Sequence, residues 1–305
     1  MPSRTLVVTG ASGFVGTHVV RQARDASWRV VAVGREDAAP QQITALADRY
    51  IGADLAGEWP VDERVDAVVH LAGLAAVGPS FAQPQRYIEV NSAIMTAMCE
   101  SLLQNSPGAR VVVVSSGSVY HSSAADRPVD ETATTYAGSP YAVAKLLVER
   151  QAEYYAHRGL DTVVMRPFNH IGPGQGLGFL VPDLARALRT LTPGGSLTVG
   201  NLDTARDYTD VRDVAAAYLT LAGAAAHSHA VYNVASGVSR TGREVLEVIA
   251  GALGVAVPPL EIDPSRLRPG DPARITGSAQ RLRDEFGWAP SRDWTSSIRD
   301  FVAAS

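Results

Sequence analysis

The chain has 305 residues, of which 46% are hydrophobic and 19% charged, which is typical of an ordinary globular protein. Its formal net charge of −4 offers no broad electrostatic attraction to nucleic acid or to anionic lipid. Cys99 is the single cysteine, which excludes an internal disulfide framework and a zinc cluster of thiolates.

Strand-like runs alternate with helical periods through the first half of the chain. Short runs rich in Val and Ile occupy residues 5–10, 29–34, 50–54, 66–73, 109–116 and 162–168. Helical patterns, such as residues 16–26 and 93–104, lie between them. This alternation predicts an α/β protein with a Rossmann-type, doubly wound parallel sheet.

The composition changes after about residue 166, where the segment RPFNHIGPGQGLG is rich in Gly and Pro. A regular alternation of strands and helices is hard to maintain through such a segment. We therefore expect a Rossmann domain over residues 1–165 and a smaller C-terminal lobe over residues 166–202 and 225–305. The amphipathic segment within residues 203–224 is expected to return to the first domain.

The turn after the first strand carries Gly10, Gly13 and Gly16 in the pattern G-x-x-G-x-x-G. Glycines at a strand-to-helix turn let the backbone approach a pyrophosphate, whose charge the N-terminus of the helix stabilises. A tight connection without a ligand is the alternative, because the spacing is one residue wider than the standard fingerprint. The position directly after a β-branched run favours a bound dinucleotide.

The end of the second strand bears on which dinucleotide binds. NAD-selective sites usually have an acidic residue here, whereas this chain has Gly34 and Arg35. Because an arginine can pair with a 2′-phosphate, we predict NADP(H) in preference to NAD(H). Alternatively, Arg35 is a solvated loop charge and Glu36 or Asp37 turns inward. Asp54, after the third strand, is a candidate partner of the adenine amino group, or else a helix cap.

Four further side chains indicate hydride chemistry on an alcohol or ketone. Tyr141 and Lys145 are four residues apart on one helix face, so the ammonium can lower the pKa of the phenol. Ser115 and Ser116 end the fifth strand, where open α/β sheets place ligands. The alternatives are an amphipathic surface pair and two serines that satisfy backbone groups.

Five motifs occur in the order found in one enzyme family, namely TGASGFVG, VVHLAG, SSGSVY, YAVAK and RPFN. Over essentially its whole length the chain resembles the extended short-chain dehydrogenases/reductases of the nucleotide-sugar epimerase/dehydratase type. Within that family, four segments resemble the GDP-4-dehydro-6-deoxy-D-mannose reductases and, next, the GDP-mannose 4,6-dehydratases. These segments are RPFNHIGPGQGLGF, VGNLDTARDYTDVRDVAAAY, VYNVASG and LRPGDPARITGSAQRLRDEFGW.

The resemblance implies a catalytic triad in which Tyr141 is the general acid or base, Lys145 binds the nicotinamide ribose and lowers the pKa of the tyrosine, and Ser116 completes the set. It also implies that NADP(H) contacts Gly10, Ser12, Gly13, Phe14, Val15, Gly16, Arg35, Asp54, Leu55, Leu71, Ala72, Gly73, Asn91, Ser115, Tyr141, Lys145, Pro167 and Asn169. The residues implied to bind a nucleotide-diphosphate sugar are Ser116, Gly117, Ser118, Tyr141, Asn169, Arg186, Asn201, Arg206 and Arg268.

Ser118 departs from the pattern of the 4,6-dehydratases, which place a glutamate at this position. A serine hydroxyl is a poor base for the proton at C5 of the sugar, so dehydration is disfavoured. We therefore predict NADPH-dependent reduction of the 4-keto group of a nucleotide-activated, GDP-linked 4-keto-6-deoxyhexose. The alternatives are a C4 epimerase, a 4,6-dehydratase and, from another class, a regulator that senses NADP without turnover.

We also expect a homodimer in which the helix of Tyr141 and the helix after Asn91 pair across a two-fold axis. Asn91 itself either stabilises the backbone near the active site or caps its helix. No nucleic acid or membrane partner is expected. A metal is not expected either, since His227 and His229 lack a third ligand nearby. The short apolar runs and the absence of a signal-peptide pattern favour a cytoplasmic protein.

Overall fold

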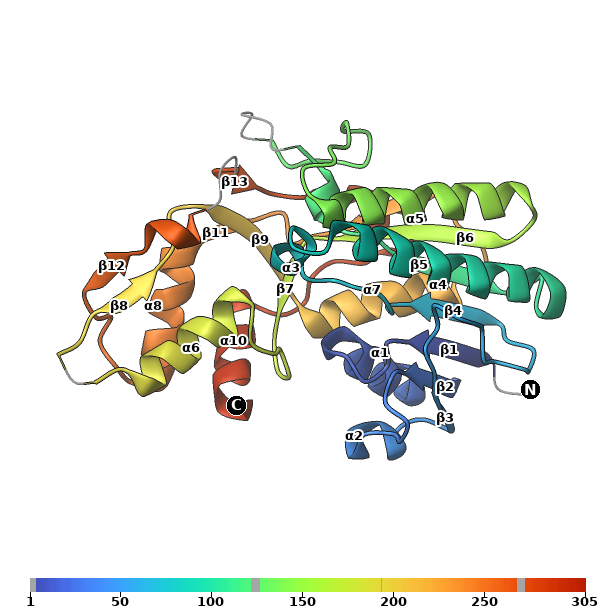
Figure 1. The fold of residues 1–305 in the computed structure, drawn as a ribbon, viewed down its shortest axis with the longest axis horizontal. Coiled ribbons are helices and arrows are strands. Elements are labelled where there is room, and N and C mark those ends of the chain that lie inside the picture. The colour runs from blue at the N-terminus through green and yellow to red at the C-terminus, as the bar shows by residue number, and fades with distance from the viewer. Residues whose placement is uncertain (1–3, 122–126, 193, 268–271) are drawn as a thin grey trace.

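The computed structural model describes residues 4–121, 127–192, 194–267 and 272–305. Within these ranges the main element is a seven-stranded sheet in which all neighbouring strands are parallel (Figure 1). Across the sheet the strands are β10 (Val231–Val234), β6 (Asp161–Pro167), β5 (Arg110–Val114), β4 (Ala67–His70), β1 (Thr5–Thr9), β2 (Arg29–Gly34) and β3 (Arg49–Gly52). The predicted Rossmann-type α/β sheet is therefore confirmed.

Helices cover both faces of this sheet (Figure 1). One face carries α4 (Pro84–Asn105) and α5 (Pro140–His157), and the other carries α1 (Phe14–Asp25), α7 (Val211–Gly223) and α9 (Gln280–Phe286); α2 (Gln41–Thr44) and α3 (Val77–Ser80) are short connections. Leu6 and Val8 pack with α1 and α7, whereas Val7 packs with α4 and α5. Burial on both faces explains why the strands read as continuous β-branched runs. Cys99 lies buried in the core on the α4 side.

One strand of the sheet comes from the segment 225–305, which we expect from the sequence to form part of the lobe. β10 pairs with β6, and α9 packs against β10. Tyr232 and Val234 are fully buried in the same core as α1 and α7. Residues 231–234 and 280–286 therefore lie with the Rossmann sheet. Of the segment 203–224, α7 packs along α1, whereas β9 (Ala205–Asp210) pairs with strands of the lobe.

The lobe is built from two small sheets and three helices, at the left of Figure 1. Its elements are β7 (Asn169–Ile171), β9, β11 (Ser239–Thr241) and β13 (Arg274–Ile275) in one sheet, β8 (Leu197–Val199) and β12 (Leu260–Ile262) in the other, and α6 (Leu180–Thr190), α8 (Gly242–Leu253) and α10 (Trp294–Ala304). The three helices share one apolar core, which includes Leu184, Ile249 and Phe301. Among the described residues, no helix is both long and apolar enough to span a bilayer.

Candidate active site

The glycine-rich turn joins β1 to α1 with very little space around its backbone. Gly10 has φ +65°, and a Cβ atom there would lie 3.0 Å from the amide nitrogen of Ala72. A Cβ atom at Gly16 would overlap the carbonyl oxygen of Gly10. Gly13 precedes α1, and no side chain caps its first amides. A close backbone turn with exposed N–H groups fits the diphosphate of a dinucleotide.

At the end of β2 the structure turns Glu36 inward. The hydroxyl of Ser12 donates a hydrogen bond to the Glu36 carboxylate at 2.7 Å, and the Tyr50 hydroxyl donates to the Glu36 carbonyl at 2.8 Å. The bond from Ser12 is the main cause that lowers the pKa of Glu36. Arg35 is exposed. The sequence places Tyr50 in a strand but does not indicate its contact with Glu36, because that contact depends on the pairing of β2 with β3.

Asp54 and Leu55, which follow β3, differ in exposure. Asp54 is exposed, and its carboxylate accepts the amide of Ala56 at 3.1 Å, which is a local turn contact. Leu55 is buried in the core with Val7 and Val33. Of this pair, Asp54 is therefore the side chain that an adenine could reach.

The segment after β4 is held by two polar side chains. Thr9 accepts the amides of Leu71 and Ala72 at 3.0 and 3.1 Å and bonds to Nδ1 of His70 at 2.9 Å. Asn91 is buried inside α4, away from its start, so it does not cap that helix. Its Oδ1 accepts the amide of Leu74 at 2.7 Å, and a Cβ atom at Gly73 would lie 2.5 Å from the same oxygen. Asn91 therefore fixes the backbone that follows β4.

The residues Ser116, Tyr141 and Lys145 come together at the carboxyl end of β5. Ser139 caps α5 by accepting the amide of Ala142 at 3.1 Å, which places Tyr141 in the first helical turn. Tyr141 is 7% exposed and shares a hydrogen bond with Ser116. Nζ of Lys145 lies 5.9 Å from the centre of the Tyr141 ring.

The proton affinities of this group differ from the expectation that Lys145 lowers the pKa of Tyr141. Burial raises the pKa of Tyr141 above its ordinary value, and only the hydrogen bond with Ser116 acts in the opposite direction. Lys145 directs its ammonium to the carbonyl of Val114 at 2.8 Å, and burial lowers its own pKa to about 8. The expected lowering of the Tyr141 pKa is therefore not seen, because burial is the largest cause that acts on the phenol. The phenol is protonated at neutral pH.

Gly117 and Ser118 form a short 3₁₀ turn, η1 (Gly117–Val119), directly after Ser116. The hydroxyl of Ser116 accepts the amide of Ser118 at 3.1 Å, and the two hydroxyls lie 2.9 Å apart. A Cβ atom at Gly117 would lie 2.9 Å from the ring of Phe168, so this position favours glycine. The exposed Ser118 hydroxyl is therefore bonded to another hydroxyl and has no activating carboxylate in that contact.

The residues implied to bind the sugar nucleotide are spread over the lobe. Pro167 is buried at the end of β6, and Asn169 is exposed on β7. Asn201 is exposed and accepts the amide of Asp203, while the Arg206 guanidinium donates to the carbonyls of Ala205 and Pro272. Arg186 lines a hollow of about 350 Å³ between α6 and α10, whose lining does not include the triad. Arg268 lies outside the described residues.

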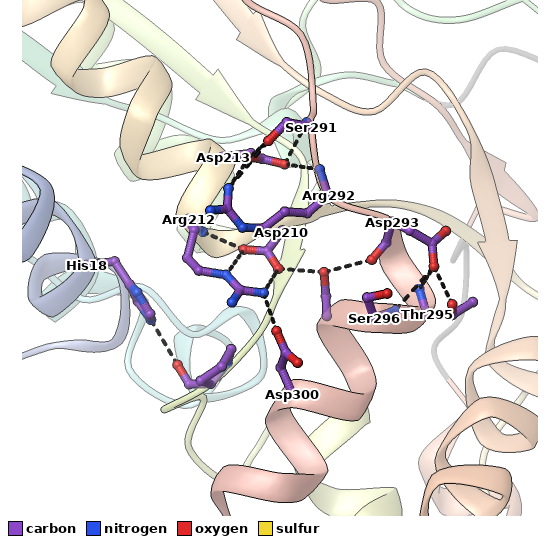
Figure 2. Close-up of polar contacts among 12 residues, drawn as sticks. His18, Asp210, Arg212, Asp213, Ser291, Arg292, Asp293, Thr295, Ser296 and Asp300 are labelled. Atoms are coloured by element: carbon purple, nitrogen blue, oxygen red, sulfur yellow. Dashed lines mark hydrogen bonds and ion pairs between the residues drawn. The ribbon is translucent and has the colours of Figure 1, made fainter.

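A second hollow, of about 840 Å³, runs along α1 from Ser12 and Gly13 to Asp25, between α7 and residues 286–292. Beside it, acidic residues join the Rossmann domain to the lobe (Figure 2). Asp210 binds Arg212 at 2.7 Å, and Arg212 also binds Asp300 on α10 at 2.7 Å. The DVRDV pattern predicts only an amphipathic helix here, because its acidic partners are distant in sequence.

Two further carboxylates hold this junction. Asp213 accepts the amides of Ser291 and Arg292 at 2.9 Å each (Figure 2). Asp207 accepts the amides of Ser236, Gly237 and Gly277 at 2.8, 2.9 and 3.1 Å, and burial raises its pKa. Each carboxylate therefore joins segments that are far apart in the chain.

The sequence reasoning also missed Glu149 and Arg166, which form a buried ion pair behind the triad. Their side chains are 9% and 7% exposed, with 2.6 Å between Nη2 of Arg166 and Oε2 of Glu149. The available signal was the spacing of Tyr141, Lys145 and Glu149, which places all three on one line of α5. Elsewhere, His227 binds Asp161 at 2.8 Å, and the described residues contain no group of three His, Cys, Asp or Glu side chains placed to hold a metal ion.

The chain is similar over nearly its whole length to known nucleotide-sugar enzymes. The GDP-6-deoxy-D-mannose reductase of Pseudomonas aeruginosa is 35% identical over 98% of this chain and 99% of its own length. A UDP-glucose 4-epimerase of Azospirillum brasilense is 29% identical over 97% and 90%, respectively.

Solved structures show the same likeness. RMD from Pseudomonas aeruginosa complexed with NADPH has a TM-score of 0.81 at 32% identity, and covers 99% of this chain and 98% of its own. MoeE5 in complex with UDP-glucose and NAD has a TM-score of 0.84 at 29% identity, with 98% of each chain covered. The model of the NAD dependent epimerase/dehydratase family matches residues 6–235. The chain belongs to the NAD dependent epimerase/dehydratase family, whose members are enzymes of the oxidoreductase type that use a pyridine nucleotide.

Proposed function

We propose that the protein reduces the 4-keto group of a GDP-linked 4-keto-6-deoxyhexose. The observation that carries this proposal is the set of half-buried Ser116 and Lys145 around buried Tyr141, in which the phenol retains its proton at neutral pH. A protonated phenol is the form required to donate a proton to the oxygen of a carbonyl under reduction. The full-length likeness to a GDP-6-deoxy-D-mannose reductase supports the choice of substrate.

In the proposed mechanism, a reduced nicotinamide coenzyme supplies a hydride to C4 when it is bound. Ser116 orients the keto oxygen by donating a hydrogen bond to it. Tyr141 donates its proton to the same oxygen as negative charge develops there. Lys145, charged below a pKa of about 8, anchors the end of β5 through the Val114 carbonyl and stabilises the phenolate that remains.

The coenzyme in this proposal is NADP(H), with Arg35 pairing the 2′-phosphate. Glu36 would have to turn away from Ser12, because a carboxylate beside a phosphate raises the energy of both. The inward position of Glu36 favours NAD(H) as the alternative, since a carboxylate accepts the ribose 2′-hydroxyl well. The comparison structures include one complex with NADPH and several with NAD.

A C4 epimerase is the second candidate, and two observations favour it. UDP-glucose 4-epimerases are frequent among the relatives, and the inward Glu36 suits the NAD(H) that an epimerase retains. A 4,6-dehydratase is disfavoured because Ser118 carries no base. A regulator without turnover is disfavoured because both Tyr141 and Lys145 are present and lie together.

The test supplies the purified protein with GDP-4-dehydro-6-deoxymannose and NADPH or NADH. We expect one coenzyme to be oxidised for each sugar reduced, and Tyr141→Phe to slow the reaction by about 10²- to 10⁴-fold. Tyr154→Phe is the matched control, because Tyr154 lies on the same helix and is 54% exposed. Isomerisation of a nucleotide sugar without net oxidation of coenzyme would overturn the reductase proposal in favour of the epimerase.

We also propose that the protein acts in the cytoplasm as a homodimer, with α4 and α5 of two subunits packed across a two-fold axis. Within one chain these helices already pack together, and Gln151 on α5 donates to Ser92 and Thr96 on α4 at 3.1 and 2.9 Å. Light scattering after size-exclusion chromatography tests the assembly, and a mass of one chain would contradict it.

A further inference from the structure

Three consecutive residues at the end of β5 each hold one residue of α5. The pairs are Val114 with Lys145, Ser115 with Glu149, and Ser116 with Tyr141. The hydroxyl of Ser115 donates to the Glu149 carboxylate at 2.5 Å. The helical partners are four residues apart, so they lie on one line of the helix. A shift of α5 along the sheet would break all three contacts together.

Glu149 is the member of this line that the proposed reaction does not use. Its side chain is 9% exposed, and its two oxygens accept Nε and Nη2 of Arg166 at 2.9 and 2.6 Å. Arg166 also donates to the Tyr120 hydroxyl at 2.8 Å, and Tyr120 donates to Asn233 on β10 at 2.7 Å. A buried carboxylate is tolerated when it is paired and fully hydrogen-bonded. Glu149 therefore links the catalytic helix to β5, β6 and β10.

The charges near Lys145 give Glu149 a second role. The titratable groups packed around Lys145 and Tyr141 are His70 on β4, Tyr87 on α4, Arg166 on β6, Tyr218 on α7 and Glu149 on α5 itself. Burial lowers the pKa of His70 to about 3, so this imidazole is neutral. Glu149 is the one carboxylate in this set, and it raises the pKa of Lys145 against the effect of burial.

We propose that Glu149 is a positioning residue that keeps Lys145 charged and holds Lys145 and Tyr141 in register with the end of β5. The proposal rests on the function above only for its effect on turnover. The charge on Lys145 is a property of the folded chain, so it can be measured without substrate, whereas the register is tested through turnover.

Lys145 is the only lysine in the sequence. Protein grown with ¹³C-labelled lysine therefore gives one lysine side-chain signal in an NMR spectrum, and its chemical shift follows the protonation of Lys145. We expect this signal in the unaltered protein to titrate with a pKa of about 8. In Glu149→Gln, which keeps a hydrogen-bonding side chain but removes the charge, the midpoint should fall by about one pH unit.

Two further variants separate charge from packing. Glu149→Asp keeps the charge, so the midpoint should return toward that of the unaltered protein even if kcat falls. Glu153→Gln, one turn further along α5, removes a surface carboxylate that pairs with Arg150 at 2.8 Å, and it should leave the midpoint unchanged. An unchanged midpoint in Glu149→Gln, or equal shifts in the Gln and Asp variants, would overturn the proposal.

If Glu149→Gln does not fold, Ser115→Ala tests the register without changing a buried charge. We expect kcat to fall by about ten-fold, with the NMR midpoint of Lys145 unchanged. If Ser115→Ala folds and keeps the full kcat, the proposed role of these contacts in holding α5 in register with the end of β5 is refuted. If the unaltered protein reduces no 4-keto sugar, the proposed function fails, while the NMR titrations still decide whether Glu149 keeps Lys145 charged.

Discussion

Replacing Lys145 by methionine should stabilise the fold while it abolishes reduction. The pKa of Lys145 falls from an ordinary 10.5 to about 8 in the fold. This difference opposes folding by about 3 kcal/mol at neutral pH. The lost hydrogen bond to the Val114 carbonyl offsets about 1 to 2 kcal/mol of that gain. We therefore expect Lys145→Met to raise the free energy of unfolding by about 1 to 2 kcal/mol near pH 7.

The dependence on pH makes this prediction specific. Because the folded pKa lies below the unfolded one, the cost of burying Lys145 is present in full below about pH 8 and is relieved as the pH rises toward 10.5. The gap between the variant and the unaltered protein should fall by about 2 kcal/mol between about pH 7 and about pH 9.5, so that it vanishes or changes sign. Groups common to both proteins cancel in this comparison.

Urea denaturation followed by tryptophan fluorescence measures both proteins at the two pH values. Arg150→Met is the matched control, because it removes a surface cation from the same helix, and its gap should not depend on pH. A gap for Lys145→Met that is the same at both pH values would refute the claim that the ammonium is buried at a cost.

Three other substitutions test the site and its supports. Tyr141→Phe should lower kcat by about 10²- to 10⁴-fold and leave the coenzyme Kd, read from nicotinamide fluorescence, nearly unchanged; loss of binding instead would point to a misfolded site. Glu36→Gln should raise the ratio of kcat/KM with NADPH to kcat/KM with NADH by about ten-fold, because it removes a carboxylate from beside Ser12. If this ratio is the same in the variant and in the unaltered protein, the Glu36 carboxylate does not lie near the ribose. Gly277→Ala should lower the free energy of unfolding by about 1 to 3 kcal/mol in urea, since its Cβ would overlap the Phe168 ring; equal midpoints would show that the ring can move.

The central sheet could be predicted from the sequence because its strands carry strong local signals. Val111, Val112 and Val113 are fully buried, and an uninterrupted β-branched run of this kind is typical of a parallel strand. β10 could not be predicted as part of that sheet, because VYNV is short and is flanked by polar residues. Its burial depends on β6 and on α9, which is formed by residues about fifty positions later.

The candidate catalytic residues could be predicted from the sequence because their chemical roles follow from their spacing along the chain. Tyr141 and Lys145 lie one helical turn apart, and Ser116 follows the carboxyl end of β5, where such sheets place ligands, so the sequence pattern indicates all three candidates. The proton affinity of Tyr141 was not predictable, since burial by other elements fixes it. A glutamate on a helix is ordinarily a solvated charge, so the buried position of Glu149 was equally hidden.

The carboxylates between the Rossmann domain and the lobe also determine which movements of the chain would break buried contacts. Asp207, Asp210 and Asp213 tie separate segments of the chain together. A rigid-body swing of the lobe about one hinge would break these tethers at once, at a cost of several kcal/mol. Movement of loops such as residues 172–178, where Gly172, Gly174 and Gly178 have positive φ angles, would leave these three tethers intact.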